Sequence, residues 1–433
     1  YDYDNESMYE GTESFSPGHI AELDLTSGNF SLHKYFDFDE YETDPVDASI
    51  SDVEQVLFDC VDRQLISDVP VGVQLSGGVD STLVAYYAKK LYDERNMDIQ
   101  GYSLSNSDCK DYDETKYIDQ VSNTLNLRAN YVDMNAKRFL SEFENCVYAF
   151  ERTIPSASVM GILLVSDIAG KDVKVLLSGE GADELCGGYT SFTKTKTLTR
   201  FPFVGKLPQF SGYLSSEEGG VTDEFLSMLN KTVSTRSVVD FIGAVNEQSF
   251  LDARRKCWDS LQGSHFERLR RFYFKYQLIS LLERQNKVCM MNSVENRVPF
   301  LDDEFVKLVF SLPEKELMRF SLRISSLSQK TTYQGKDILK KLSAMKYGNR
   351  FAYRTKQWVR APLGSYLNTK EMREYVENVV REKMRSRGII NADAFRTAYE
   401  HLDKSDNVKM CWKAINMEIW CQLFVDGRMP VKW

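Results

Sequence analysis

Short apolar runs alternate with longer amphipathic stretches through the first half of the chain. Four runs have the length and apolar content of buried strands, at residues 71–75, 99–104, 129–134 and 173–177. Between them, apolar residues recur at helical spacing over residues 82–90, 113–125, 137–150 and 159–169. Strands that alternate with helices are typical of a parallel sheet covered on both faces. The pattern therefore predicts an α/β fold with a doubly wound parallel sheet.

The strand pattern fades after about residue 200, and helical spacing takes over. Apolar residues recur at helical intervals over residues 222–229, 266–291, 303–310, 335–345, 370–385, 392–401 and 409–424. We therefore expect an α/β core over residues 46–200 and a mostly helical part over residues 201–433. Residues 1–45 form a shorter leader, in which two strand-like segments around the turn at residues 27–29 predict a hairpin.

Composition and charge narrow the classes of protein that the chain can represent. The 433 residues carry a net charge of −9, which argues against a general nucleic-acid binder, and no apolar run reaches membrane-spanning length. The eight cysteines include no C-x-x-C pair and the four histidines form no cluster, which disfavours zinc sites and Ser-His-Asp chemistry. Reduced cysteines and an acidic, polar start predict a cytoplasmic protein without a membrane or nucleic-acid partner. Because the chain does not begin with Met, we expect it to be part of a longer translation product.

A serine–glycine turn follows the first predicted strand and has the sequence SGGVDS at residues 76–81. Glycine lets the backbone approach a ligand closely, and the free amides and dipole of a helix start favour an anion. The hydroxyl groups of Ser76 and Ser81 add donors for phosphate oxygens. The Asp80 carboxylate would repel phosphates unless both share a divalent metal. The turn therefore predicts a phosphate site with a metal ligand, and a plain strand-to-helix turn is the alternative.

A second turn of the same kind follows the fourth predicted strand. It reads SGEGADE at residues 178–184 and contributes the carboxylates of Glu180, Asp183 and Glu184. Ligands bind at the carboxyl ends of strands in such sheets, so both turns are expected at one ligand-binding edge. A metal ion held by Asp80 and Asp183 would explain the acidic groups of both turns, and a solvated acidic turn is the alternative.

The basic groups that a triphosphate needs must come from elsewhere, because SGGVDS contains none. Arg297 lies in the stretch NSVENRVPFLD at residues 292–302, where it could fork onto a carboxylate or phosphate, or form a salt bridge at a helix end. Lys336 opens a predicted helix and Lys356 lies in a basic, aromatic loop. As isolated residues, both lysines would be ordinary surface charges.

Four motifs together resemble one family, the synthetase domain of asparagine synthetase and its relatives in the PP-loop ATP pyrophosphatase superfamily. SGGVDS resembles the pyrophosphatase loop, LLSGEGADELCGGY the second family signature, and NSVENRVPFLD the third. GKDILKK, followed by RTK, resembles the lysine-bearing segment near the C-terminus. The leader, with FSPGH and its hairpin, resembles the end of the amino-terminal glutaminase domain, so residues 1–45 are expected to be a remnant of that domain.

The resemblance implies a ligase that amidates a carboxylate in two steps, with ATP and Mg²⁺. The carboxylate attacks the α-phosphorus of ATP to give an acyl-adenylate and pyrophosphate, and ammonia then displaces AMP. The family implies aspartate as the acceptor and asparagine as the product. It also implies glutamine as the source of ammonia, through a glutaminase half or partner that this chain lacks. A homodimer is one assembly that the resemblance leaves open.

The resemblance also assigns roles to individual residues. The pyrophosphate would lie against Ser76, Gly77, Gly78 and Ser81. Mg²⁺ would be held by Asp80 and Asp183. Adenine and ribose would lie among Leu75, the backbone near Leu104, Ser178 and Gly179. The phosphate charge would be neutralised by Lys356, joined by Lys336. Glu180 would position the intermediate or accept a proton from ammonia, and Arg297 would orient the acceptor or its own motif.

Departures from the family pattern keep other acceptors open. Residues 151–160 resemble the substrate segment of asparagine synthetases only loosely, and Cys186 and Asn296 are substitutions inside matching motifs. The alternatives are an enzyme that amidates a sugar acid or a peptide, one that closes a ring, a PP-loop tRNA-modifying enzyme, or a binding protein without catalysis. Glu180 favours amidation over ring closure. The acidic net charge disfavours a tRNA substrate, and intact Asp80, Asp183 and Lys356 disfavour a non-catalytic role.

Overall fold

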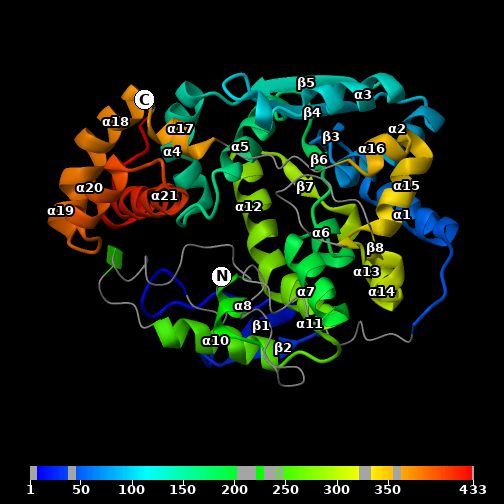
Figure 1. The fold of residues 1–433 in the computed structure, drawn as a ribbon, viewed down its shortest axis with the longest axis horizontal. Coiled ribbons are helices and arrows are strands. Elements are labelled where there is room, and N and C mark those ends of the chain that lie inside the picture. The colour runs from blue at the N-terminus through cyan, green and yellow to red at the C-terminus, as the bar shows by residue number, and fades with distance from the viewer. Residues whose placement is uncertain are drawn as a thin grey trace.

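A five-stranded parallel sheet with the order β5-β4-β3-β6-β7 forms the centre of the molecule (Figure 1). The computed structural model describes residues 7–37, 45–201, 221–228, 241–242, 247–320, 333–354 and 362–431. The strands are β3 (Val71–Leu75), β4 (Gln100–Ser105), β5 (Arg128–Asp133), β6 (Val175–Leu177) and β7 (Glu295–Arg297). Val73 pairs in register with Gly101 on one side and Leu177 on the other, so β3 and β6 run side by side.

Helices cover both faces of the sheet, which confirms the predicted doubly wound arrangement. One face is covered by α1 (Ile50–Gln64), α2 (Val79–Glu94) and α3 (Thr115–Leu125). The other is covered by α4 (Ala136–Phe150), α5 (Ser158–Ala169) and α12 (Leu278–Met291). Successive residues of β6 enter opposite cores, Val175 and Leu177 the first and Leu176 the second. Burial on both faces explains why the central strands β3 and β6 are largely apolar.

Most of the described part of the chain after β6 is helical, as the spacing predicts. These helices are α6 (Ala182–Cys186), α7 (Thr190–Arg200), α8 (Asp223–Met228), α10 (Glu247–Asp259), α11 (His265–Phe272), α13 (Asp303–Ser311), α14 (Glu314–Leu317), α15 (Asp337–Tyr347), α16 (Asn349–Ala352), α17 (Leu363–Leu367), α18 (Lys370–Tyr375), α19 (Glu382–Arg387), α20 (Ala392–Glu400) and α21 (Ser405–Trp420). A π-helical turn at Tyr273–Gln277 joins α11 to α12. Among the described helices, none is long and apolar enough to cross a membrane.

One strand is not predicted from the sequence, and one predicted helix start requires correction. The stretch at residues 292–302, for which the sequence leaves open a ligand-binding Arg297 or a salt bridge at a helix end, contains β7, which pairs in parallel with β6 at the edge of the sheet. The sequence SDVE at residues 51–54 fits a capping box and predicts a helix start at Ser51, but α1 begins earlier, at Ile50. Ser49 caps it by accepting a hydrogen bond from the Asp52 amide, and the Asp52 side chain accepts one from the Ser49 amide in return.

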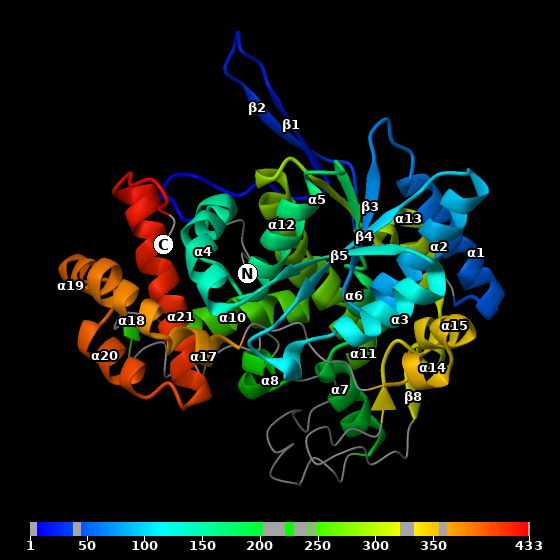
Figure 2. The ribbon, with the colours of Figure 1, turned by 90° about the horizontal axis from the view of Figure 1, so that it is seen from above.

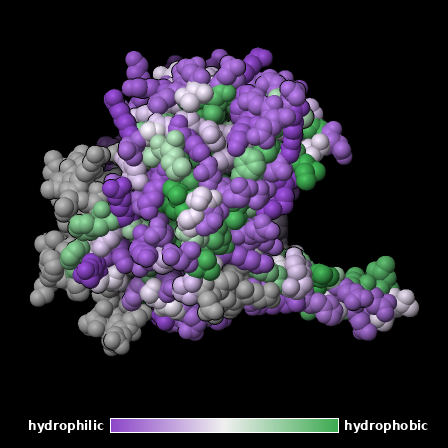
Figure 3. Space-filling view, turned by 90° about the vertical axis from the view of Figure 1, so that its right-hand side faces the viewer, coloured by the Kyte–Doolittle hydropathy of each residue, from purple (hydrophilic) through white to green (hydrophobic). Residues whose placement is uncertain are grey.

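The predicted leader hairpin is confirmed, and it projects from the body of the protein (Figures 2 and 3). Among the described strands, β1 (His19–Leu23) and β2 (Phe30–Lys34) pair only with each other. Its apolar side chains stand in solvent, since Ile20, Phe30 and Leu32 are 56%, 65% and 48% exposed. An isolated two-stranded hairpin is at best marginally stable in water. The exposed apolar side chains of the hairpin are therefore typical of an element that packs against another protein surface.

Candidate active site

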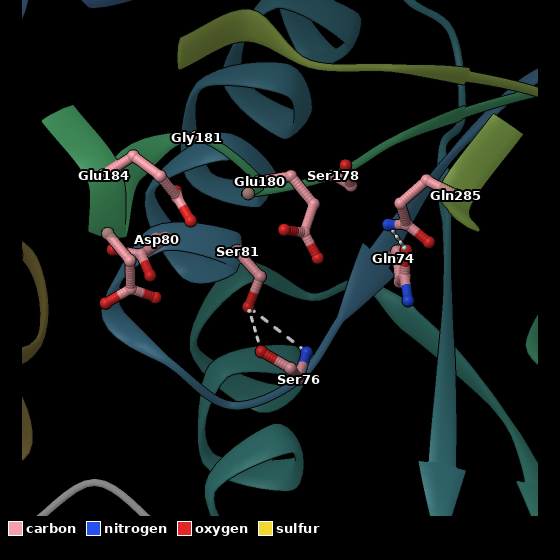
Figure 4. Close-up of a pocket in the computed structure, with 11 residues that line it drawn as sticks. Gln74, Ser76, Asp80, Ser81, Ser178, Glu180, Gly181, Glu184 and Gln285 are labelled. Atoms are coloured by element: carbon pink, nitrogen blue, oxygen red, sulfur yellow. Dashed lines mark hydrogen bonds between the residues drawn. The ribbon is translucent and has the colours of Figure 1, made fainter. Parts of the chain in front are cut away.

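The two serine–glycine turns meet in one pocket at the carboxyl ends of β3 and β6 (Figure 4). The lining residues are Gln74, Ser76, Asp80, Ser81, Ser178, Gly179, Glu180, Gly181, Asp183, Glu184 and Gln285. All but one come from the two turns and the strand ends beside them, and Gln285 reaches in from α12. The strand register thus brings together segments that lie about a hundred residues apart in the sequence.

Hydroxyl groups and a left-handed glycine shape the first turn. Ser81 Oγ lies 3.0 Å from Ser76 Oγ and accepts a hydrogen bond from the Ser76 amide at 3.2 Å. Gly77 has a φ of +68°, a conformation that favours glycine. Asp80 and Ser81 belong to the first turn of α2, so a phosphate here would meet the positive end of that helix.

The second turn packs directly against the first. A Cβ on Gly179 would lie 2.7 Å from the Ser81 amide nitrogen and 2.9 Å from the Asp80 Cβ, so only glycine allows this approach. Ser178 Oγ donates to Asn296 Oδ1 of β7 at 3.1 Å. Asn296, a departure from the family pattern, therefore contacts a residue that lines the pocket.

Lys336 lies between the carboxylates of the two turns. Its Nζ is 2.5 Å from Asp80 Oδ2 and 2.7 Å from Asp183 Oδ1, and its side chain is buried. Gly188 leaves room for this group, because a Cβ there would collide with Asp183 and the end of Lys336. Burial lowers the pKa of the Lys336 ammonium, but Asp183 and Asp80 more than offset that effect, so the pKa lies above its ordinary value. The site therefore contains a fixed positive charge at the point where its acidic groups converge.

The donor set of Asp80 and Asp183 fits a magnesium ion. Both carboxylates contact one nitrogen, so they are close enough to share a cation. Asp80 Oδ1 is buried without a hydrogen-bond partner among the described residues. Three or more His, Cys, Asp or Glu side chains do not gather around a common point in that part of the chain. Mg²⁺ is commonly held by one or two carboxylates, with substrate phosphates and water completing its shell, so the pair suits a metal that arrives with a nucleotide.

The other two carboxylates of the pocket have separate partners. Arg284 of α12 donates to Glu180 Oε1 at 2.9 Å. Glu184 is 1% exposed and accepts a hydrogen bond from the Tyr189 hydroxyl. Burial, reinforced by the charges of Asp183 and Glu180, raises the pKa of Glu184 to about 7. Among the described residues that line the pocket, Glu180 is therefore the carboxylate that an arginine contacts.

The lysine-bearing segment reaches the first turn through Arg354. Its guanidinium donates to the Gly77 carbonyl and lies over the Tyr117 ring, 3.9 Å from the ring centre. Lys356, two residues further on, lies outside the described residues. The structure thus brings Ser76, Asp80, Ser81, Ser178, Gly179, Glu180, Asp183 and Lys336 together, and the functions of these residues remain proposals.

Several expected site residues do not line the pocket: Gly77 and Gly78 lie within the first turn, Lys336 lies beside its carboxylates, and Leu75, Leu104 and Arg297 face elsewhere. Leu75 is buried in the strand core beside Gly101, and Leu104 packs over Gly161 of α5. Arg297 points away toward the end of α1, where it donates to the carbonyls of Gln64 and Ile66 at 2.8 and 2.7 Å. Orienting its own motif, and not the acceptor, is the role that these contacts support.

Arg297→Ala is expected to weaken folding and to leave substrate affinity unchanged. The charged hydrogen bonds to two carbonyls and to Glu295 would be lost, at a cost of about 1.5–3 kcal/mol in unfolding free energy. Denaturant unfolding measures this loss, and Arg95→Ala, which removes an exposed pair with Asp62, is the matched control. If Arg297→Ala instead raised the KM for the acceptor and left stability unchanged, Arg297 would have to orient the acceptor.

The parallel sheet and its paired turns are those of a PP-loop synthetase domain, and the chain belongs to the asparagine synthase family, which it matches over residues 52–422. It is 23% identical over 437 residues to the glutamine-hydrolysing asparagine synthetase 1 of Bacillus subtilis, covering 93% of this chain and 64% of that protein. It is 26% identical over 328 residues to asparagine synthetase 3 of the same organism, covering 71% of this chain and 49% of that protein. Amidase chry2 of Gibberella zeae is 23% identical over 385 residues, covering 76% of this chain and 56% of that protein.

These comparisons confirm the resemblance that the four motifs suggest. They also agree with the expected class of enzyme, an asparagine synthase-like ligase. The chain spans less than two thirds of the length of these relatives.

Proposed function

We propose that the protein amidates a carboxylate through an acyl-adenylate. A carboxylate oxygen of the acceptor attacks the α-phosphorus of ATP, the bond to the β-phosphate bridging oxygen breaks, and pyrophosphate leaves. Ammonia then attacks the acyl carbon, AMP leaves with the bonding electron pair, and the nitrogen loses a proton. The convergence of the Asp80 and Asp183 carboxylates on one cation, at the ends of two adjoining strands, supports this proposal most strongly.

The residues of the two turns divide the work of the first step. The Ser76 and Ser81 hydroxyls and the backbone of residues 76–79 bind the leaving pyrophosphate. Asp80 and Asp183 hold Mg²⁺, which supplies charge neutralisation for the phosphates. Lys336 adds a positive charge beside the same oxygens, and Lys356 provides a second one. Stabilising charge where it develops is the main way in which phosphoryl and adenylyl transfer are accelerated.

Glu180 is suited to the second step. Arg284 fixes its carboxylate at the pocket wall through a 2.9 Å bond. In that position it orients the acyl-adenylate or accepts a proton from the attacking ammonia.

Aspartate is the acceptor that we propose first, and a different carboxylate is the alternative. The relatives named asparagine synthetase support aspartate. The relatives named amidases, together with Cys186 and Asn296 inside the motifs, support a sugar acid, a peptide or another acid. A PP-loop tRNA-modifying enzyme is the more distant alternative.

Aspartate is expected to stimulate exchange between labelled pyrophosphate and ATP by about tenfold or more over other acids, within the range that a specific pocket achieves. The assay measures the first step alone and needs no nitrogen donor. A panel of amino acids, sugar acids, carboxyl-bearing peptides and bulk tRNA covers the alternatives. Preferential stimulation by another acid, or by tRNA, would replace aspartate as the acceptor.

Ammonia is proposed to come from glutamine through a glutaminase unit outside this chain. The exposed apolar hairpin β1–β2 is the element best suited to contact such a unit. The eight cysteines are free in the structure, and seven of them are buried, which suits a reducing compartment and supports the proposed cytoplasmic location.

A further inference from the structure

Arg354, which follows α16, contacts the first turn from outside the pocket. Its guanidinium donates a hydrogen bond to the Gly77 carbonyl and lies 3.9 Å from the centre of the Tyr117 ring. It also lies 5.1 Å from the centre of the Phe351 ring. Glu114 Oε1 is 3.9 Å from Arg354 Nη2, which is too far for a hydrogen bond. A nearly buried cation, with 11% of its side chain exposed, therefore holds the outer side of the turn.

Packing alone does not account for an arginine at this position. Burial lowers the pKa of the Arg354 guanidinium, and the Glu114 carboxylate offsets only part of that effect. Arg354 Nε is buried without a hydrogen-bond partner among the described residues. Both features oppose folding, and an apolar side chain between the two aromatic rings would avoid them. The hydrogen bond to Gly77 is the contact that an apolar side chain could not make.

That hydrogen bond fixes the direction of one peptide group. In a trans peptide, the carbonyl of one residue and the amide of the next point in opposite directions. Because the Gly77 carbonyl is directed toward Arg354, the Gly78 amide is directed the other way, where it lies 3.4 Å from Ser76 Oγ. Ser76 lines the pocket. The outward carbonyl and the inward amide thus belong to the same rigid unit.

We propose that Arg354 is a positioning residue, which holds the Gly77–Gly78 peptide so that the Gly78 amide faces the leaving pyrophosphate. The inference rests on the proposed function, in which the backbone of residues 76–79 binds pyrophosphate. Because both residues of this peptide are glycines, the peptide can rotate at little steric cost once the hydrogen bond is lost. Its carbonyl oxygen would then face the negatively charged phosphate oxygens. Arg354 therefore acts through the turn, by keeping a donor oriented before the reaction begins.

Hydrogen exchange of the full chain tests the assignment, with inorganic pyrophosphate and Mg²⁺ as the probe. In the unmodified protein, we expect pyrophosphate to protect the fragment that contains residues 76–79. Arg354→Met is expected to lose most of this protection and to bind pyrophosphate about 10-fold to 100-fold more weakly, the loss typical of removing a group that orients a ligand-binding group. The kcat of pyrophosphate–ATP exchange should fall by a similar factor, whereas the KM for the acceptor should not change.

Arg373→Met is the matched control. Arg373 lies 5.3 Å from the centre of the Tyr399 ring and donates to Asn368 Oδ1 at 3.0 Å, so its loss removes contacts of the same kinds. It belongs to α18, which lies at the opposite end of the molecule from α16 (Figure 1). This variant should keep the protection and the affinity for pyrophosphate.

Arg354→Lys keeps a charged donor and is expected to bind pyrophosphate about threefold to tenfold more weakly than the unmodified protein, because it lacks the planar fork of arginine. If Arg354→Met does not fold, Arg354→Lys takes its place in every comparison.

Equal protection of residues 76–79 in Arg354→Met and in the unmodified protein would overturn the proposal. So would equal losses in Arg354→Met and Arg373→Met, since the effect would then be a general one on stability. Protection that depends on Arg354, in a protein that shows no pyrophosphate–ATP exchange with any acid, would contradict the proposed reaction and leave the positioning role intact. An unmodified protein in which pyrophosphate does not protect residues 76–79 would contradict both.

Discussion

Asp80→Asn is expected to lower pyrophosphate release by about a hundredfold to a thousandfold, the loss typical of removing one well-placed electrostatic group. The Asp80 carboxylate contacts Lys336 with one oxygen and leaves the other buried without a partner among the described residues. Asparagine keeps the shape of the side chain in the first turn of α2 but removes the charge that a magnesium ion requires. Release of pyrophosphate at saturating ATP and Mg²⁺ measures the effect.

The matched control changes the same residue type in the same helix. Asp93 lies near the end of α2, is half exposed and pairs with Lys89, so Asp93→Asn should leave the reaction unchanged. Asp183→Asn should resemble Asp80→Asn, because both carboxylates contact one ammonium nitrogen. Near-normal pyrophosphate release by Asp80→Asn would show that Asp80 does not hold the metal. A large loss in Asp93→Asn would show that the effect is not local to the site.

The strands that form the sheet core could be predicted because burial on both faces makes them apolar runs. β3 follows this rule, and its predicted bounds at residues 71–75 are the observed ones. β7 could not be predicted in the same way. Its residues Glu295, Asn296 and Arg297 are polar, and it is a strand only because it pairs with β6 at the edge of the sheet. The sequence of β7 itself contains no signal that predicts this pairing.

The two turns of the site could be predicted for a related reason. Serine, glycine and aspartate at the end of a buried strand are unusual enough to be informative, and strand register then brings Asp80 and Asp183 together. The positions of the Arg297 and Lys336 side chains could not be predicted from the sequence, because both depend on contacts between distant segments of the chain. Lys336 meets Asp80 over 256 residues of sequence. Of the two glutamines that line the pocket, Gln74 had a visible signal, a polar residue inside an apolar strand, whereas Gln285 on α12 had none.

Lys336→Met is expected to inactivate the protein and also to change its response to magnesium. Removing one partner of a buried ion pair typically lowers the unfolding free energy by about 3–5 kcal/mol, because the remaining charge is left uncompensated. Here two carboxylates would face each other without a cation. Added Mg²⁺ should then stabilise the variant more than it stabilises the unmodified protein, in which the Lys336 ammonium competes for the same oxygens. Thermal unfolding with MgCl₂, compared with NaCl at equal ionic strength, measures the difference.

Two further variants separate this competition from a general loss of stability. Lys340→Met changes the same residue type one turn further along α15, where burial and the charge of Lys336 lower the pKa of the lysine to about 8. It should not gain sensitivity to Mg²⁺. The double variant Lys336→Met with Asp80→Asn should lose most of that sensitivity, because only one carboxylate remains to hold the ion. Equal stabilisation of the unmodified protein and Lys336→Met by Mg²⁺ would mean that lysine and metal occupy separate positions. In that case Lys336 and the metal would both neutralise the phosphates without competing for the two carboxylates.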